Sequence, residues 1–247
     1  MARILPIKHR LKFLALKSSL RLKLHGTWDQ RFHYTARGTC KSHAYSSEAI
    51  LSKLPYTGCK INDTIPTELV LDRTFKIFLQ DRTSAINFVE QVHPGTWQIY
   101  TDGSKAGELT GAGFCVLTNN QERHRASYQL GTMPTVYQCE LFALHMASIW
   151  ANDNISSTTN IIIFSDSQAA LQAINSTRVK SRLVLDIIDQ LNTLGTTHKV
   201  EIRWIPGHEG VPGNERADDL ARQGSSSKPV RTRTLPANNR PGHRQIH

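Results

Sequence analysis

The 247-residue sequence lacks any apolar run that approaches the length of a membrane span, and runs such as Ile161 to Phe164 are only strand-sized. A helix needs about 20 apolar residues to cross a bilayer, so we expect no membrane partner. Hydrophobic residues make up 39% of the chain and charged residues 20%, which is typical of a soluble globular protein. At this length we expect one domain of ordinary size with appendages.

Cysteine is scarce and scattered. The four cysteines form no CxxC pair and stand at Cys40, Cys59, Cys115 and Cys139. This spacing disfavours a disulfide framework and a zinc knuckle, and we expect reduced thiols in the core.

Acidic residues are missing from both ends of the chain, since residues 1–26 and 225–247 contain no Asp or Glu. Lys and Arg number 15 against 7 acids in residues 1–95, 10 against 13 in residues 96–224, and 5 against 0 in residues 225–247. Basic flanks around an acidic middle suit a polyanionic partner, because Lys and Arg that neutralise phosphates release counterions. Solvated tails are the alternative, and charge alone does not decide between them.

The N-terminal segment interleaves Lys and Arg with Leu, and a basic amphipathic helix is predicted from Leu11 to Leu24. Three interpretations compete: a mitochondrial transit peptide, a basic helix that lies on nucleic acid, and a remnant helix of a larger upstream domain. A turn at His93-Pro-Gly-Thr96 indicates a domain boundary. We therefore divide the chain into a basic, partly helical region at 1–95, a folded domain at 96–224 and a disordered basic tail at 225–247.

Strands are predicted where apolar and β-branched residues alternate or cluster, at 97–101, 111–118, 123–130, 160–164 and 200–205, with short strands at 68–72 and 75–79. Helices are predicted where apolar residues recur at helical spacing, at 135–150, 168–174, 183–194 and 214–223. Asp102-Gly-Ser is interpreted as the turn that ends the first strand, and Gly224 as the stop of the last helix. The order predicts an α/β fold with a mixed sheet and helices on both of its faces.

Four carboxylates fall at informative places on these elements. Glu140 lies on the apolar face of its helix, where a lone carboxylate costs several kcal/mol unless it is paired, protonated or bound to a metal. Asp166 follows a buried strand, where open α/β sheets place their ligands. Asp102 ends the first predicted strand, and Asp218 lies on the final helix. If the strands of Asp102 and Asp166 are neighbours, the four side chains converge.

Clustered anions require a counter-charge, and we see no matching Lys or Arg in these segments. The simplest solution is a pair of hard divalent cations, for which oxygen ligands favour Mg²⁺ or Mn²⁺ over zinc. Two such ions clamp the attacking and leaving oxygens of a phosphodiester displacement. The alternative is that each acid is separately a cap or a surface charge.

Four ordered motifs resemble the ribonuclease H family, and most closely the ribonuclease H domains of non-LTR retrotransposon reverse transcriptases. The motifs are Ile99-Tyr-Thr-Asp102-Gly-Ser-Lys, Gln138-Cys-Glu140-Leu-Phe-Ala-Leu, Ile163-Phe-Ser-Asp166-Ser-Gln-Ala-Ala-Leu, and Trp204-Ile-Pro-Gly-His208-Glu-Gly-Val-Pro-Gly-Asn214-Glu-Arg-Ala-Asp218. The likeness covers roughly residues 95–224 and implies a mixed five-stranded sheet. It also implies a monomeric, Mg²⁺-dependent endonuclease, with Mn²⁺ as a substitute, that cuts the RNA strand of RNA–DNA hybrids and leaves 5′-phosphate and 3′-hydroxyl ends.

The resemblance implies a role for each matching residue. Asp102 would bridge both ions, Asp218 would hold the ion that activates water, and Glu140 with Asp166 the ion at the leaving oxygen. His208 would assist proton transfer or product departure. Gln168 would contact the minor groove, where the 2′-hydroxyl distinguishes RNA from DNA. The other substrate-binding residues implied are Gly103, Ser104 and Asn214.

Weaker likenesses extend upstream. Two segments are similar to the connector between polymerase and nuclease in such elements: Leu5-Pro-Ile-Lys-His-Arg-Leu-Lys-Phe-Leu-Ala-Leu-Lys and Phe75-Lys-Ile-Phe-Leu-Gln-Asp-Arg. This likeness favours the remnant helix at the N-terminus. A polymerase signature is absent, and an upstream polymerase domain is expected only in a parent polyprotein. Two alternatives stay open: a non-catalytic nucleic-acid-binding remnant and a DNA nuclease of the same fold. A nuclear or cytoplasmic location is favoured, with the mitochondrion as the alternative.

The sequence also departs from the family pattern. Val136 and Tyr137 stand where family members often have Asn or Gln, three or four residues before the helix carboxylate. Between Ser176 and Lys180 there is no room for the basic helix with which some members grip substrate. We therefore hypothesise that Arg178, Lys180, Arg182 and the basic flanks take over hybrid binding.

Overall fold

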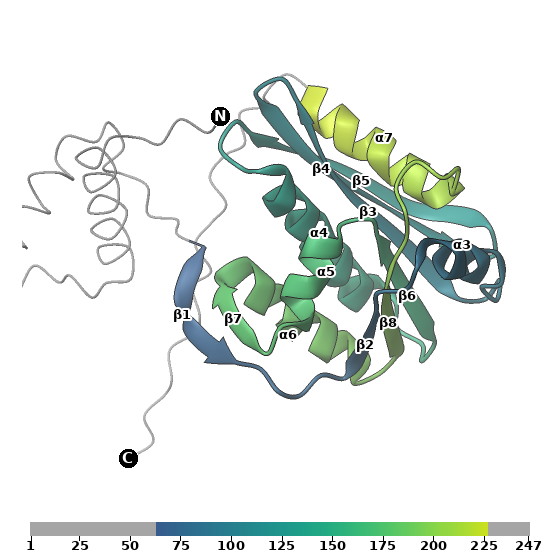
Figure 1. The fold of residues 1–247 in the computed structure, drawn as a ribbon. Helices are drawn as coiled ribbons and strands as arrows, with labels where there is room; N and C mark the ends of the chain where they lie inside the picture. The colour runs from purple at the N-terminus through teal and green to yellow at the C-terminus, as the bar shows by residue number, and fades with distance from the viewer. Residues whose placement is uncertain (1–62, 227–247) are drawn as a thin grey trace, which may run out of the picture. The chain divides into compact units, whose positions relative to one another are not determined.

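The computed structural model describes residues 63–226, and both the predicted N-terminal helix and the C-terminal tail lie outside this range (Figure 1). The described chain forms two compact units. The smaller contains the residues up to Arg73 together with Ala173–Ile188, and the larger contains Thr74–Gln172 with the residues from Asp189 onward. Each unit is considered separately.

The larger unit is built on a six-stranded sheet in the order β2-β8-β6-β3-β4-β5. Its strands are β2 (Phe75–Phe78), β3 (Trp97–Ala106), β4 (Leu109–Thr118), β5 (Gln121–Gly131), β6 (Asn160–Ser165) and β8 (Lys199–Trp204). The first four strands in this order are parallel, and β3, β4 and β5 are antiparallel. The α/β class with a mixed sheet is thus confirmed. The strand count of five is wrong, because β2 adds a sixth strand beside β8.

Helices cover both faces of this sheet. They are α3 (Arg82–Glu90), α4 (Val136–Asn154) and α7 (Pro212–Ser226), whereas α5 (Gln168–Asn175) and α6 (Arg182–Gly195) contribute residues to both units. Ala112 packs with Cys139 of α4 on one face. Cys115 packs with Ala217 of α7 on the other, where α3 also lies. None of the helices in the described part has the length and apolar character that crossing a bilayer requires.

The interpretation of Asp102-Gly-Ser as a turn is wrong. β3 continues through these residues to Ala106, and Asp102 pairs with Gly113 of β4 in an unbroken antiparallel ladder. The chain turns instead at Gly107, which has the left-handed φ of 62° that glycine adopts without strain. Asp102 therefore projects from the middle of a rigid sheet.

Gly224 does not end the last helix. α7 runs from Pro212 to Ser226, and Gly224 lies buried within it. A Cβ atom at Gly224 would lie 2.3 Å from the carbonyl oxygen of Tyr128 on β5. A glycine is required there because the helix packs directly on the strand backbone. From the sequence alone, such a packing glycine looks the same as a glycine that ends a helix.

The smaller unit contains an antiparallel pair of strands, β1 (Thr64–Leu69) and β7 (Arg178–Ser181). β1 begins earlier than the strand predicted at 68–72, and neither β7 nor α3 was predicted. The Asp63 carboxylate accepts hydrogen bonds from the backbone N–H of Leu183 at 2.8 Å and from the Ser181 hydroxyl at 2.7 Å. Residues upstream of the expected boundary at 96 thus cap the start of α6.

Candidate active site

The sheet register places Asp102 beside Asp166. Thr101 of β3 pairs with Ser165 of β6 in a parallel ladder, so the two aspartates that follow them are neighbours. The Thr101 hydroxyl donates to the carbonyl oxygen of Phe164 at 3.1 Å, and the indole N–H of Trp204 donates to the carbonyl oxygen of Asp166 at 2.9 Å. These bonds fix the backbone from which both carboxylates project.

Glu140 approaches from α4. The helix starts with a capping box, in which the Thr135 hydroxyl accepts from the Gln138 N–H and the Gln138 side chain accepts from the Thr135 N–H. Glu140 follows in the second turn and is only 6% exposed. Gly103 permits this approach, because a Cβ atom there would lie 2.5 Å from the backbone nitrogen of Glu140.

Three of the four predicted carboxylates meet directly. One carboxylate oxygen from each of Asp102, Glu140 and Asp166 lies within 4.8 Å of the others. Asp218 on α7 is buried nearby, and its charge raises the pKa of both Asp102 and Glu140. The expectation that no Lys or Arg matches these acids is wrong, because Arg222 lies 2.5 Å from Asp218 Oδ2.

Burial makes this cluster costly in its charged form. Burial, with the charges of Asp166 and Asp218, raises the pKa of Asp102 to about 7. Burial and the neighbouring aspartates also raise the pKa of Glu140 well above its ordinary value. The pKa of Asp166 is raised by burial, and a hydrogen bond with the Asn214 side chain opposes that rise. A bound cation would relieve the repulsion that these shifts express.

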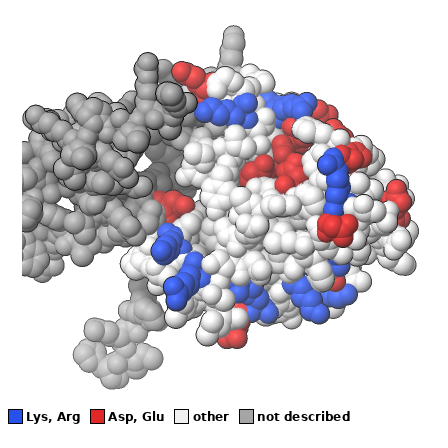
Figure 2. All heavy atoms as spheres, in the orientation of Figure 1, with Lys and Arg blue, Asp and Glu red and all other residues white. Residues whose placement is uncertain are grey.

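The donor set fits hard divalent cations. All three clustered ligands are carboxylates, and Mg²⁺ and Mn²⁺ prefer such oxygen ligands. Oε2 of Glu140 is buried and has no hydrogen-bond partner among the described residues. A buried carboxylate oxygen normally has a partner, so this one is consistent with a metal ligand. Figure 2 shows acidic side chains gathered near the middle of the face turned to the viewer, with basic side chains around them.

His208 stands on the loop between β8 and α7. Its backbone has a left-handed φ of 56°, its side chain is 72% exposed, and its Nδ1 lies 3.9 Å from Asp218 Oδ2. His208, Glu215 and Asp218 form a second group with ligand atoms within 4.8 Å of one another. We did not single out Glu215 or Arg222 from the sequence, although each is one helical turn from Asp218 and that spacing was the available signal.

The predicted substrate-binding residues occupy different environments. Gln168 is exposed at the start of α5, and Ser104 is half-buried on β3. Asn214 is 3% exposed and bonds to Asp166, which gives it a supporting position within the carboxylate cluster. Gly103 is buried against α4. Their roles in substrate binding stay predictions.

Comparisons with known proteins identify relatives of the chain. The family model described as RNase H matches residues 94–226. The chain is 30% identical over 148 residues to ribonuclease H of Shewanella amazonensis, with 54% of this chain and 90% of that protein aligned. It is 31% identical over 140 residues to ribonuclease H of Nitrosococcus oceani, with 51% and 90% aligned.

A solved structure is also similar. The crystal structure of RNase H1 from the halophilic archaeon Halobacterium salinarum is 22% identical, with 53% of this chain and 97% of that chain covered at a TM-score of 0.43. The family model alone accounts for more than half of the chain, including every residue of the carboxylate cluster. The chain therefore belongs to the RNase H family of hydrolases.

Proposed function

We propose that the protein is an endonuclease that uses two divalent cations to hydrolyse the RNA strand of RNA–DNA hybrids, leaving 5′-phosphate and 3′-hydroxyl ends. The observation that carries the proposal is the meeting of Asp102, Glu140 and Asp166 within 4.8 Å, with Asp218 beside them. Membership of the RNase H family supports hybrid hydrolysis in general terms. The cation requirement follows from the chemistry of the donor set.

Each carboxylate has a place in this proposal. Asp102 would hold both cations, Glu140 and Asp166 one of them, and Asp218 the other. Bound Mg²⁺, or Mn²⁺ in its place, supplies an activated water and neutralises the charge that develops on the leaving oxygen. The protein's own contribution is to hold these oxygens in place on two parallel strands and two helices.

The neighbouring side chains orient this set. Asn214 bonds to Asp166, and Arg222 pairs with Asp218 at 2.5 Å, so each aspartate has a fixed partner. His208 lies on an exposed loop with Nδ1 3.9 Å from Asp218 Oδ2. We assign to that nitrogen assistance with proton transfer or with product departure.

Hybrid recognition would use residues around the cluster. Gln168 is exposed two residues after Asp166, which suits a contact to a 2′-hydroxyl. Val136 and Tyr137 are 41% and 38% exposed and precede Glu140 by one helical turn. They offer an apolar surface at positions where Asn or Gln is common in the family. Such a surface could pack against a sugar of the uncleaved strand.

The experiment that tests the proposal uses the full chain and four labelled substrates: hybrid, duplex DNA, duplex RNA and single-stranded RNA. We expect Mg²⁺-dependent cleavage of the hybrid's RNA strand alone, with 5′-phosphate ends. Cleavage of duplex DNA would favour the DNA nuclease of the same fold. Binding of the hybrid without turnover would favour the non-catalytic remnant.

Adjacent acids on α7 supply a matched control. Asp218 is 9% exposed, whereas Asp219 beside it is exposed. We expect Asp218→Asn to lower the cleavage rate by a hundredfold or more, on the order of a lost catalytic group, and Asp219→Asn to leave it unchanged. Equal rates in the two variants would show that the wrong acid has been assigned.

We also propose that the chain derives from a retroelement polyprotein with an upstream polymerase domain. The four motifs support this origin, as does the connector-like segment Phe75–Arg82, which forms β2 and the first residue of α3.

A further inference from the structure

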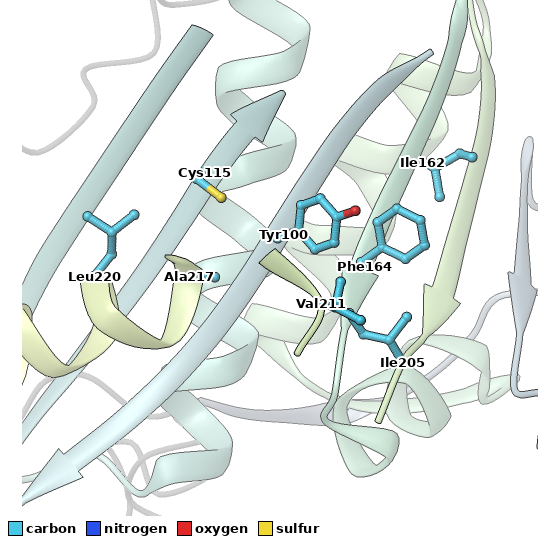
Figure 3. Packing of buried hydrophobic residues seen from close by; sticks show 8 residues of the cluster. All are labelled: Tyr100, Cys115, Ile162, Phe164, Ile205, Val211, Ala217 and Leu220. Carbon is cyan, nitrogen blue, oxygen red and sulfur yellow. The ribbon is translucent and has the colours of Figure 1, made fainter. Parts of the chain in front are cut away.

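The loop at residues 206–211 carries His208 on a backbone that is anchored at both ends. Ile205 before it and Val211 at its end are 1% and 6% exposed and belong to the core cluster drawn in Figure 3. Between them, His208 and Gly210 adopt left-handed φ values of 56° and 71°. The ends of the loop are therefore fixed in the core, and its tip carries both left-handed residues.

The tip has a contact outside the catalytic cluster. The carboxylate of Glu209, the residue next to His208, pairs with the guanidinium of Arg82. Arg82 is the first residue of α3, and it lies before residues 94–226, which the RNase H family model matches. The partner of the loop thus lies outside the residues that the family model matches.

α3 is held in place by its N-cap and by its packing on β8 and the core. Its N-cap Asp81 accepts from the backbone N–H of Ser84 at 3.0 Å and from the Ser84 hydroxyl at 2.6 Å. Phe88 of α3 lies 3.5 Å, ring centroid to guanidinium carbon, from Arg203 on β8, and the same helix packs on the cluster that contains Ile205 and Val211. Arg82 therefore projects from a helix fixed to the strand that leads into the loop.

We propose that Arg82 is a positioning residue for His208, and that α3 holds the loop tip through Glu209 in the arrangement that places His208 beside Asp218. This inference rests on the proposed function, because it assigns control of the same site to a helix outside the matched family domain. The pair is partly exposed, with side chains 62% and 29% exposed, so its effect on the loop is at most about fivefold in population. It is also weakened by salt.

The test measures loop opening and cleavage separately in the full chain. Conformational exchange at the backbone amides of residues 207–210, measured by NMR relaxation dispersion, reports the opening of the loop whether or not the protein cleaves hybrids. We expect Arg82→Gln to raise that exchange by up to about fivefold. We expect it to lower the single-turnover cleavage rate by a smaller factor, in proportion to the closed population that is lost. The charge reversal Arg82→Glu with Glu209→Arg restores both, which a merely structural role would not produce.

The matched control is Arg125→Gln. The side chain of Arg125 is 61% exposed and pairs with Glu122 at 3.4 Å on β5. The substitution therefore removes an ion pair that is as exposed as the Arg82–Glu209 pair but lies away from the loop. Exchange at 207–210 in Arg82→Gln equal to that in Arg125→Gln would overturn the proposal, as would failure of the charge reversal to restore it. Faster exchange with unchanged single-turnover cleavage would also overturn it. A wild-type chain that does not cleave hybrids refutes the proposed function instead, and the exchange comparison then decides whether Arg82 holds the loop.

Discussion

At the scale of single residues, burial decides the chemistry of Asp102. A carboxylate in the middle of a sheet, 7% exposed and facing two other aspartates, has its pKa raised to about 7, whereas the ordinary value is 3.8. The protein therefore holds a carboxyl group whose charged form is unfavourable without a ligand. Sites that bind cations or perform chemistry commonly do this, because the ligand supplies the missing stabilisation.

The first prediction concerns pH without metal. A carboxyl with a raised folded-state pKa binds its proton more tightly in the folded protein, so folding becomes less favourable as pH rises from about 4 to about 7. In EDTA, we expect the stability of the wild type relative to Asp102→Asn to fall across this window. Chemical denaturation at a series of pH values measures it, and parallel pH profiles for the two proteins would contradict the raised pKa.

The second prediction separates stability from activity at the same residue. In EDTA above pH 7, Asp102→Asn should unfold at a higher temperature than the wild type, because it removes a buried charge facing Glu140 and Asp166. The corresponding gain in the free energy of unfolding should be on the order of a few kcal/mol. Asp219→Asn, at an exposed neighbour of Asp218, is the control and should change the unfolding temperature little. A lower unfolding temperature for Asp102→Asn would sink this prediction.

At the scale of elements, glycine sets the distance between β3 and α4. Gly103 lets the strand backbone lie against the helix, and a Cβ atom there would meet the Glu140 nitrogen at 2.5 Å and the Cys139 carbonyl carbon at 2.8 Å. Both atoms belong to the helix backbone, which cannot move aside as a flexible side chain can. The position of Glu140 therefore depends on the absence of a side chain at Gly103.

The third prediction follows from this contact. Gly103→Ala should displace α4, lower stability by about 1–3 kcal/mol as overpacking does, and reduce hybrid cleavage sharply. Gly95→Ala is the control, since its Cβ atom would lie no closer than 3.4 Å to another residue. Thermal unfolding and cleavage rates measure both variants. If Gly103→Ala behaves like Gly95→Ala, the close approach of strand and helix does not position Glu140.

Most elements could be predicted because their patterns are local. The buried strand at Asn160–Ser165 contains a continuous apolar run, and the helix of Glu140 has apolar residues at helical spacing. The errors arise where tertiary contacts override local signals. Asp102-Gly103-Ser104 has turn composition but continues β3, because β4 supplies a partner for each residue. Gly224 resembles a helix stop but serves close packing on β5.

The same reasoning explains the site. The carboxylates could be found because acids stood among apolar residues in ordered motifs. Arg222 was missed, although it follows Asp218 by one helical turn and pairs with its carboxylate. The contact between Arg82 and Glu209 joins residues far apart in the chain, and no local pattern indicates it.

At the scale of the whole molecule, the family domain is extended at its N-terminal side. Residues before the predicted boundary at 96 take part in the larger unit, since β2 pairs with β8 and α3 packs on its core. The boundary itself stays a prediction. Phe75 of β2 is 5% exposed. In the smaller unit, the Arg73 guanidinium donates to the carbonyl oxygens of Ile174 and Ser176 at 3.0 and 2.8 Å. Residues before 96 therefore contact later elements within each of the two units.

The fourth prediction compares two truncations. A chain of residues 96–226 should be less stable than one of residues 63–226 by at least about 2 kcal/mol, from the lost burial of Phe75 and the lost Asp63 cap. Urea denaturation of the two chains measures this. Equal midpoints and slopes would show that residues 96–226 are self-sufficient.

The central claim is that the buried carboxylates form a cation site. The most direct measurement is the unfolding temperature of the full chain at increasing Mg²⁺, against K⁺ at matched ionic strength, because a ligand that binds only the folded state raises it. We predict a Mg²⁺-specific rise in the wild type and in Asp219→Asn, and none in Asp102→Asn. A rise of the same size in all three proteins, or in none, would contradict the account.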